Sequence, residues 1–331
     1  MIDRITLREL NKKGFFNRVT DAVATPTFTQ TNIGMPAGIL SSLNNQVVKN
    51  IVAYRTADKA LGKREKLLDW ADDNYFTPMV ESTGQTVVYS DYSSPLLAGM
   101  NVNYNMVGHY RFTTKFHYGE LEAQQLYKSK VNYEETLLST ITEAIGIELN
   151  RAAFNGFMQN SSNAFLCYGL LNNPELPNYE AAAKTFDAMT WEEVMAFFGK
   201  AIAKLTSQTG NNINGESKIR VVISSDKFAH LQSKYTALGI SVYQTILNTY
   251  PNIEFVSAYE FNKAYQNKDI IYFIGESDAG GIAETTKLGY SELALMGNVV
   301  QDDYGYTQAI SAGTCGALVF KPLFIVRYNN I

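Results

Sequence analysis

The segment from Thr83 to Tyr118 places the strongest constraint on how this chain folds. Polar and apolar residues alternate in NVNYNM at 101–106, the run TVVY at 86–89 precedes it, and SSPLLAG at 93–99 separates the two runs. Alternation with a period of two predicts β-strands, and the Ser, Pro and Gly between the runs predict a turn. We therefore expect a long two-stranded ribbon. Because two strands cannot bury both of their faces, such a ribbon is only marginally stable alone in water and needs another surface to pack on.

The N-terminal region also lacks a packing surface of its own. From Met1 to Met35 the apolar residues follow no sustained period, and TPTFTQTN at 25–32 is typical of an extended arm that lies on a neighbour. The opening MIDRITLRELNKKGFF has scattered charges and no apolar core like that of a signal peptide. No apolar run elsewhere approaches the length of a membrane span. We expect a soluble protein made in a reducing cytosol.

The longest helical pattern runs from Asn132 to about Met158, which predicts a helix roughly 40 Å long. Its charged residues lie mostly off one face, and that face carries Leu137, Leu138, Ile141, Ile145, Leu149, Ala152 and Phe157. The stripe fits an ordinary core helix as well as a strut for the whole molecule.

The stretch YGLLNNPELPNY, residues 168–179, ends this helical region and contains no catalytic-looking group. Gly169 permits a left-handed or tight turn, Leu170 and Leu171 suit a core, and prolines 174 and 177 prevent a helix from continuing. The sequence predicts a structural corner here.

A regular mixed unit follows the corner. Thr190 and Glu193 form a capping box that opens a helix. The apolar face of this helix is formed by Trp191, Val194, Met195, Phe198, Ile202 and Leu205. Strands are expected at Ile219–Ser224, Ile253–Val256 and Ile270–Ile274, and helices at Ser225–Lys234 and Val242–Asn248, which indicates an α/β or α+β unit. The chain then returns to strands at Tyr304–Ile310, Ala317–Phe320 and Leu323–Tyr328, with Ser311–Gly316 (SAGTCG) as the turn between the first two.

Length and composition limit the class of protein. A chain of 331 residues exceeds what one compact core usually carries, so two structural units are expected. The hydrophobic fraction of 46% and the charged fraction of 18% are those of a globular protein. Asp and Glu (32) outnumber Lys and Arg (28), giving a net charge of -4, so the chain has no electrostatic reason to bind a nucleic-acid backbone.

The candidate metal ligands are few and scattered. Cys167 and Cys315 lack the spacing of a disulfide framework or a zinc site, and we expect both to be buried thiols. His109, His117 and His230 occur singly. His109 and His117 are eight residues apart, which would place them on one face of a regular strand, but no carboxylate cluster or cysteine completes a ligand set. We predict no metal site and no bound cofactor.

The remaining motifs predict no catalysis. Nothing matches a Walker A loop, a G-x-S-x-G elbow, H-E-x-x-H or an EF-hand loop. The small residues of DAGGIA at 278–283 are best explained as a surface loop, and Asp302 and Asp303 as a solvated turn rather than a cation site. The 21 Tyr and 18 Phe are not interleaved with basic residues, so we assign them to the core and to protein interfaces rather than to base stacking.

The order of these parts resembles that of the major capsid proteins of tailed phages with the Hong Kong 97-type fold. A loose arm is followed by a long β ribbon, a long helix, a Gly-Leu-Leu-Asn corner, a central mixed unit and terminal strands. The closing TCGALVFKPLFIVRYNNI at 314–331 is similar to the end of one branch of that family, which often has a Thr-Gly-Gly-Val hairpin, a basic residue before Pro and a terminal Gly-Ile. This chain departs from that pattern at Cys315 and Asn330, which replace glycines.

The resemblance implies an α+β fold that divides into the named parts of a capsid subunit. The expected boundaries are an N-terminal arm at 1–35, a linking helical region at 36–73, the extended loop (E-loop) at 74–116, the spine helix and peripheral domain at 117–184, the axial domain at 185–296, and return strands of the peripheral domain at 297–331. In this interpretation the corner contains no chemistry because its role is to turn the chain from the spine helix into the axial domain.

The function implied by the resemblance is structural rather than enzymatic. Hexamers and pentamers of the chain would assemble into an icosahedral phage head that encloses double-stranded DNA without reading its sequence. Assembly in the bacterial cytoplasm would involve no membrane, and scaffold, portal and decoration proteins are possible partners. Because the N-terminal region is short, we expect a separate scaffold protein or none. An encapsulin-like compartment and, from another class, a soluble α/β enzyme with its site in 185–296 are the alternatives.

Lysine positions bear on covalent locking, since some shells of this family are joined by an isopeptide bond between an E-loop lysine and a neighbour's asparagine. That reaction needs a neutral amine, and no lysine occurs from Leu67 through Thr114. Lys66 and Lys115 flank the base of the ribbon, and Arg111 cannot replace a lysine because its guanidinium stays protonated. We predict noncovalent contacts made by ribbon residues such as Val87, Tyr89, Leu96, Leu97 and Tyr104.

Overall fold

The computed structural model describes residues 55–83, 91, 99–128, 133–159, 164–277, 283–293, 295–302 and 304–331. The predicted arm at 1–35, the first predicted ribbon strand at 86–89, most of the turn after it and Asp303 lie outside these residues. By their contacts the residues divide into two units, Met1–Tyr54 with Leu121–Thr136 and Arg55–Glu120 with Leu137–Ile331. In the first unit the structure describes only residues 121–128 and 133–136, all of them helical. The account below concerns the second unit.

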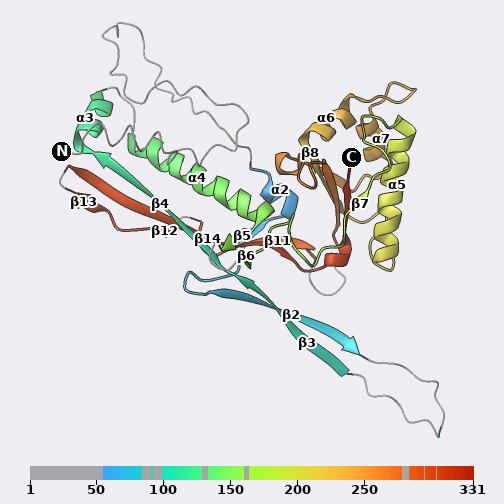
Figure 1. The fold of residues 1–331 in the computed structure, drawn as a ribbon, viewed down its shortest axis with the longest axis horizontal. Helices are drawn as coiled ribbons and strands as arrows, with labels where there is room; N and C mark the ends of the chain where they lie inside the picture. The colour runs from blue at the N-terminus through green and yellow to red at the C-terminus, as the bar shows by residue number, and fades with distance from the viewer. Residues whose placement is uncertain are drawn as a thin grey trace. The chain divides into compact units, whose positions relative to one another are not determined.

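Figure 1 shows the order of the helices and strands along the chain. The helices are α2 (Ala57–Leu61), α3 (Glu120–Lys128), α4 (Tyr133–Asn155), α5 (Trp191–Gln208), α6 (Ser225–Ser233) and α7 (Val242–Thr249), with short 3-10 helices η1 (Tyr259–Phe261) and η2 (Pro322–Phe324). Helix α4 confirms the long helix predicted from the sequence. Among the described residues, no helix combines the length and apolar character needed to cross a bilayer.

A five-stranded mixed sheet forms the centre of the region after the corner. Its strands, in spatial order, are β7 (Glu180–Ala181), β15 (Ile325–Asn329), β10 (Ile270–Gly275), β8 (Ile219–Ser224) and β9 (Ile253–Ala258). β8 and β9 are parallel, whereas β10 pairs antiparallel with both β8 and β15. The predicted strands and helices of this unit are confirmed. The capping box is present as predicted, because the Thr190 side chain accepts from the Glu193 N–H and the Glu193 carboxylate accepts from the Thr190 N–H.

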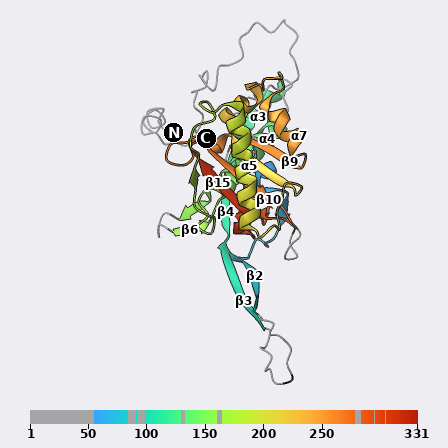
Figure 2. The ribbon, with the colours of Figure 1, turned by 90° about the vertical axis from the view of Figure 1, so that its right-hand side faces the viewer.

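Both faces of this sheet are buried, which explains why β8 and β10 have apolar residues at nearly every position. On one face, which α5 covers (Figure 2), Ile223, Phe273 and Val326 pack with residues of that helix. The Phe198 ring meets Phe273 edge-on, and the Phe197 ring is tilted against it. On the other face, Val222, Tyr272, Ile274 and Ile325 pack with residues of α2, the end of α4 and the corner. The sheet therefore ties the corner and the end of α4 to the helices on its far side.

The corner docks directly on the last turn of α4. Leu170 N–H donates to the Ala153 carbonyl and Leu171 N–H to that of Phe154, both at 2.9 Å, and the Leu170 side chain is fully buried. A Cβ placed on Gly169 would lie 2.3 Å from the carbonyl oxygen of Phe154, so glycine is needed for close approach of two backbones rather than for a left-handed turn. The predicted corner is confirmed.

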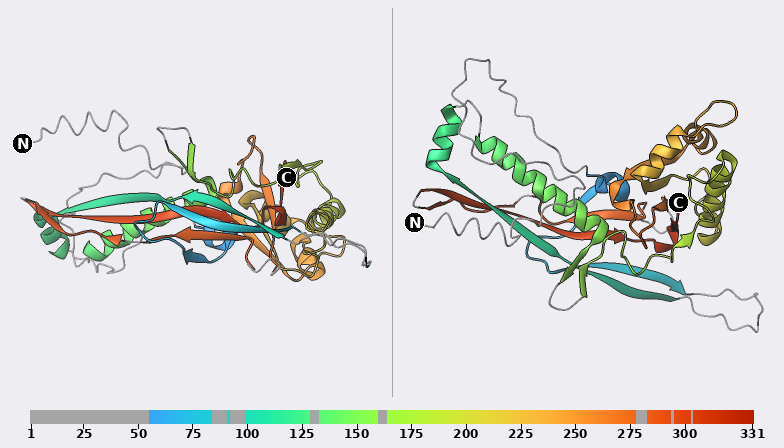
Figure 3. Two further views of the ribbon diagram at one scale, coloured as in Figure 1. Left: turned by 90° about the horizontal axis from the view of Figure 1, so that it is seen from below. Right: turned by 45° about the horizontal axis from the view of Figure 1, so that its top comes forward.

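A six-stranded sheet lies alongside α4. It contains β1 (Arg64–Lys66), β11 (Thr286–Tyr290), β14 (Gly305–Val319), β12 (Leu295–Met296), β13 (Val300–Asp302) and β4 (Tyr110–Gly119). The long strand β14 pairs over ten residues with β4 and over its other half with β11. Ile310 and Ala312 of β14 pack against Ile141, Ile145 and Leu149 of α4, and this cluster accounts for part of the apolar stripe of the helix. Figure 3 gives two further views of α4 and this sheet.

The predicted turn at Ser311–Gly316 is wrong, because these residues run through the middle of β14. The small residues permit close packing rather than chain reversal. A Cβ on Gly313 would lie 2.3 Å from Nε2 of His109, and one on Gly316 would lie 2.5 Å from the Tyr168 carbonyl oxygen. Gly316 has φ of 73°, and the register with β11 slips here by one residue, so Cys315 is the extra residue of a β-bulge. Asn330, the other departure from the family pattern, has φ of 63°, a conformation that Asn tolerates.

Candidate assembly surface

The predicted ribbon is present, but its first strand begins earlier than the sequence indicated. Strand β2 (Asn74–Thr83) pairs antiparallel with β3 (Gly99–Gly108) over ten residues, from Asn74 opposite Gly108 to Thr83 opposite Gly99. The predicted run at 101–106 lies within β3 and is confirmed. Pro78 obscured β2 in the sequence, because proline donates no ladder hydrogen bond and is uncommon inside strands. Within this ribbon proline is tolerated because each strand has an unpaired edge.

The two faces of the ribbon differ sharply in chemistry. The register places Phe76 opposite Met106, Pro78 opposite Tyr104 and Val80 opposite Val102, so these residues and Met100 share one face. We call this the apolar ribbon face. The exposed fractions are 55% for Phe76, 59% for Val80, 70% for Met100, 48% for Val102, 63% for Tyr104 and 60% for Met106.

An extended surface of this kind is unusual on a protein that acts alone. Isolated exposed apolar residues are ordinary, but a contiguous patch indicates a binding surface. The apolar ribbon face contains no charged residue, and removing it from water would contribute about 25 cal/mol for each Å² buried. Its strands leave the rest of the unit (Figure 1), and its side chains stay 48–70% exposed beside the described residues of the chain.

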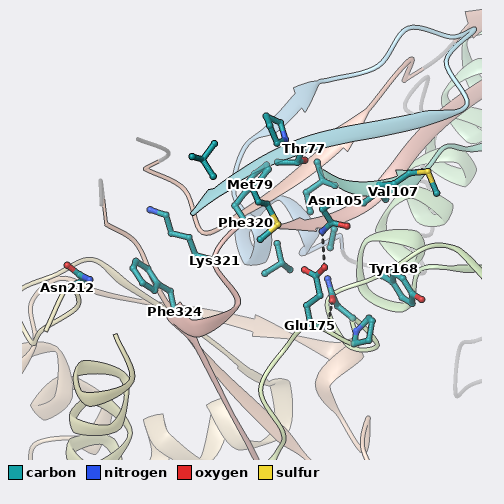
Figure 4. Close-up of a pocket in the computed structure, with 18 residues that line it drawn as sticks. Thr77, Met79, Asn105, Val107, Tyr168, Glu175, Asn212, Phe320, Lys321 and Phe324 are labelled. Atoms are coloured by element: carbon teal, nitrogen blue, oxygen red, sulfur yellow. Dashed lines mark hydrogen bonds between the residues drawn. The ribbon is translucent and has the colours of Figure 1, made fainter. Parts of the chain in front are cut away.

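The opposite ribbon face is mostly polar, although Met79 on it is 41% exposed, and it borders a groove of about 430 Å³. This face includes Thr77, Asn103 and Asn105, and the groove lies between the ribbon, the corner and the end of β14 (Figure 4). Across it, Asn105 Nδ2 donates to Glu175 Oε1 at 2.9 Å. The lining also includes Lys321, whose ammonium lies 5.1 Å from the centroid of the Phe324 ring. The groove contains no cluster of titratable groups suited to catalysis.

The base of the ribbon is fixed by His109, which stands between β3 and β4 and is 4% exposed. Its Nδ1–H donates to the Asp72 carbonyl at 2.7 Å, because a carbonyl can only accept, and its Nε2 therefore accepts from the Ser291 hydroxyl at 2.7 Å. Arg111 bonds to the same loop through the carbonyls of Trp70 and Asp72 and the carboxylate of Asp73. β3 pairs with β2, whereas β4 pairs with β14. The neutral, buried imidazole of His109 lies between β3 and β4, where this change of pairing occurs.

Because the His109 imidazole is buried, we predict that the free energy of unfolding depends on pH. Burial, and then the nearby charge of Arg111, lower the pKa of His109 below its usual 6.5, while the Asp72 carbonyl and the charges of Asp72 and Asp73 oppose the shift. The unfolded chain therefore takes up the proton first, so the contribution of His109 to stability is complete above pH 6.5 and declines as the pH falls toward the folded pKa. Urea unfolding of unassembled subunits at about pH 7.5 and 5.5 should show a larger loss for the natural chain than for His109→Gln. Equal losses in the two proteins would contradict this assignment.

The other predicted site residues do not converge on one place. His117 lies on the β4–β14 ladder, where its Nδ1 is 3.0 Å from the Thr307 hydroxyl. His230 lies on α6, and its Nε2 is 3.3 Å from the Asp187 carboxylate. The pKa of Asp187 is lowered, chiefly by its hydrogen bond from Lys227. Among the described residues, no three His, Cys, Asp or Glu side chains gather where they could hold a metal ion. Asp302 ends β13, and most of the 278–283 loop lies outside the described residues.

The two cysteines are buried thiols, as predicted. The fold brings them close together although the sequence separates them, since a Cβ on Gly316, next to Cys315, would lie 3.4 Å from Sγ of Cys167. Burial raises the pKa of each to about 12. Both thiols therefore stay protonated and unreactive at neutral pH.

The fold, the long α4 alongside a sheet and the projecting apolar ribbon together define a capsid subunit of the Hong Kong 97 type. The chain belongs to the family described as Pa193 gp26 major capsid protein, whose model matches residues 26–330. As a major capsid protein it is a structural component of the virion. The family assignment favours a phage capsid over an encapsulin-like compartment. A search of curated protein sequences gave no match.

Solved structures with the same fold include other capsids. The capsid of Myoviridae phage XM1 superimposes with a TM-score of 0.71 at 12% identity, covering 88% of this chain and 97% of the other. The capsid of the native GTA particle gives 0.60 at 10% identity, covering 91% and 98%. Gordonia phage Cozz gives 0.58 at 11% identity, covering 93% and 98%. At these identities the likeness concerns the fold alone.

Proposed function

We propose that this chain forms hexamers and pentamers that close into an icosahedral phage head around double-stranded DNA. The observation that carries the proposal is the apolar ribbon face, which is extended, uncharged and largely exposed among the described residues. Head-to-tail contacts between different surfaces give rings when the rotation closes, and rings joined by further contacts give a shell. Each contact can be weak, because later contacts form at high effective concentration.

The proposal assigns roles to the parts of the chain. Residues 74–116 form the E-loop, which lies on a neighbouring subunit. Residues 117–184 and 297–331 form the peripheral domain around the spine helix, and residues 185–296 form the axial domain. Residues 1–35 act as an arm on a neighbour, with residues 36–73 as the link. The net charge of -4 suits enclosure of DNA without sequence-specific binding. Assembly takes place in the host cytoplasm, with scaffold, portal and decoration proteins as candidate partners and no part for enzymatic activity.

Negative-stain microscopy and light scattering of the purified full chain test the assembly. We expect closed shells or isolated hexamers and pentamers. A compact monomer under every assembly condition would overturn the proposal. The cargo separates the alternatives, because particles purified from an infected host should protect double-stranded DNA from nuclease, whereas an encapsulin-like shell would enclose a protein.

We further predict that the shell contains no covalent links between subunits. The E-loop has no lysine from Leu67 through Thr114, and Lys66 at its base forms an ion pair of 2.5 Å with Glu292. That hydrogen bond raises the pKa of Lys66, which keeps the amine protonated and poorly nucleophilic. Boiled particles on a denaturing gel should give one band near 36.9 kDa. A ladder that survives reductant would show that the prediction is wrong.

A further inference from the structure

The chain contains two Asn-Gly pairs, Asn155 with Gly156 and Asn214 with Gly215. An Asn-Gly pair can react with itself in water, because glycine has no side chain to shield its backbone nitrogen from the asparagine side chain. The nitrogen attacks the amide carbon, ammonia leaves, and the succinimide ring that forms takes up water to give aspartate or isoaspartate. The two pairs have the same chemistry in the sequence, and the structure places them in different surroundings.

The first pair is held in an unreactive arrangement. Asn155 is the last residue of α4, and the Gly156 N–H donates to the Ala152 carbonyl at 2.9 Å, as in the turns of the helix before it. A Cβ placed on Gly156 would lie 2.5 Å from the Cys167 carbonyl oxygen, so the backbone of another segment packs tightly on this glycine. Attack by the Gly156 nitrogen would require this hydrogen bond to break and the end of α4 to move.

The second pair lies in the turn between α5 and β8, where Asn214 is exposed. The Ser217 N–H donates to the Asn214 carbonyl at 3.2 Å, which closes a turn with Gly215 and Glu216 at its central positions. The hydrogen bonds among the described residues include none from the Gly215 N–H. The nitrogen that would attack is therefore not held by another acceptor, and water reaches the amide.

Three donors surround the side-chain oxygen of Asn214. Its Oδ1 accepts from the Glu216 N–H, the Ser217 N–H and the Ser217 hydroxyl, each at 3.0 Å. An amide oxygen has two lone pairs, whereas the oxyanion formed by attack on the amide carbon has three. The three donors therefore match the oxyanion better than the amide. Donors fixed in advance around such an oxygen stabilise the transition state of attack on a carbonyl carbon.

We propose that the turn at 214–217 is a self-modification site, at which the Gly215 nitrogen attacks Asn214 and converts it to aspartate or isoaspartate. A bond forms between the Gly215 nitrogen and Cγ of Asn214, and the bond from Cγ to the side-chain nitrogen breaks. That nitrogen leaves as ammonia with the proton of the Gly215 N–H, and water then opens the ring at either carbonyl. The reaction needs no oxidant or cofactor.

Each conversion adds one negative charge to a chain whose net charge is -4. The aspartate product can accept the same three hydrogen bonds, which become stronger with a charged acceptor, so it preserves the turn. The isoaspartate product lengthens the backbone by one atom and disrupts it. The free subunit contains the whole site, so the inference does not depend on the proposed shell.

Incubation of the purified full-length chain in heavy-oxygen water at mildly alkaline pH tests the proposal. Peptide mapping by mass spectrometry measures the uptake of heavy oxygen at each asparagine. Asn214 should react at least roughly tenfold faster than Asn155 in the same sample, because only Asn214 has donors for the oxyanion. Unfolding in urea should slow Asn214 and bring the two rates together. Equal rates in the folded chain, or a faster reaction of Asn214 in urea, would overturn the proposal.

Ser217→Ala tests the donors themselves. It removes one of the three and should lower the rate at Asn214 roughly tenfold. If the hydrogen bonds instead protect Asn214 by holding the turn rigid, the same variant should react faster, which would overturn the proposal. Ser233→Ala is the matched control, because it removes an exposed hydroxyl that donates to the His230 carbonyl at another turn, and it should leave the rate unchanged.

Gly215→Ala tests the nucleophile. The added methyl group shields the backbone nitrogen and should also lower the rate at least roughly tenfold. Its Cβ would lie 3.4 Å from the Tyr250 ring, an ordinary contact, and Gly215 has no left-handed φ, so the subunit should stay folded. Circular dichroism checks the fold of each variant. A Gly215→Ala chain that takes up heavy oxygen at Asn214 as fast as the natural chain would show direct hydrolysis by water and overturn the proposal.

Discussion

The substitution Val102→Asp is expected to abolish shell formation and to leave the subunit folded. Val102 lies at the centre of the apolar ribbon face opposite Val80 and is 48% exposed in the subunit. A carboxylate placed there stays in water in the free subunit, so the free energy of unfolding should change by no more than about 0.5 kcal/mol. In the proposed contact the same carboxylate would be buried without a partner, which costs several kcal/mol.

The effect should be large because every subunit of a shell repeats the same contact. A penalty in each ribbon contact also weakens the contacts that depend on it through effective concentration. We expect no closed particles by microscopy at concentrations where the natural chain assembles completely. Circular dichroism and urea unfolding of the soluble variant measure whether the fold is retained.

Asn103→Asp provides the matched control for this experiment. It adds the same charge one residue away, on the polar ribbon face, and keeps the oxygen that accepts from the Tyr104 N–H. Particle yield should stay close to that of the natural chain. If both variants assemble, the apolar ribbon face does not lie in a subunit contact. If neither assembles, added charge anywhere on the ribbon is harmful and the two faces are not distinguished.

Local signals in the sequence were sufficient for the central sheet. β8 has the predicted bounds, Ile219 to Ser224, and α5 begins after its capping box. These elements are determined by residues within a few positions of each other, since caps and buried runs are short-range features. The alternation at 101–106 identified β3 and the apolar half of its side chains in the same way.

Long-range packing determined the features that the sequence did not reveal. The small residues at 311–316 have the composition of a turn, yet Gly313 and Gly316 are small because His109 and the Tyr168 carbonyl approach them from distant parts of the chain. Strand β2 was missed because Pro78 is a poor strand residue in isolation, and its register with β3 assigns Phe76 and Val80 to the apolar face. Half of the apolar ribbon face could therefore not be identified without the pairing of the two strands.

Arg327 is the clearest example of a residue whose role depends on tertiary structure. It reads as an interruption in the apolar strand IVRYN, but it is only 7% exposed. Its Nε donates to the Pro177 carbonyl at 2.6 Å and its Nη2 to the Leu176 carbonyl at 3.0 Å. The guanidinium also lies 4.3 Å from the ring centroid of Tyr179 and 5.8 Å from that of Tyr272. Arg327 thereby fastens the corner to β15.

The charge of Arg327 is balanced here by dipoles and ring faces. Burial raises the pKa of Tyr179 and Tyr272, so the two phenols, which hydrogen-bond to each other, remain neutral. Aromatic faces attract a guanidinium, and a planar group with several N–H donors can satisfy two carbonyls at once. No other side chain could make this combination of contacts between the corner and β15.

We expect Arg327→Ala to lower the free energy of unfolding by about 4 kcal/mol, because it leaves two buried carbonyls without donors and opens a cavity. Arg327→Lys should lose about 2 kcal/mol, since an ammonium keeps the charge but not the planar donor geometry. Arg151→Ala is the control, because the Arg151 side chain is 64% exposed and its ion pair with Glu148, at 3.5 Å, lies at the surface, so its loss should stay within about 0.5 kcal/mol. Urea unfolding of unassembled subunits measures all three. Equal losses of unfolding free energy in the Arg327→Ala and Arg327→Lys variants would mean that the donor geometry contributes nothing. A loss for Arg327→Ala as small as that for Arg151→Ala would show that Arg327 does not stabilise the corner.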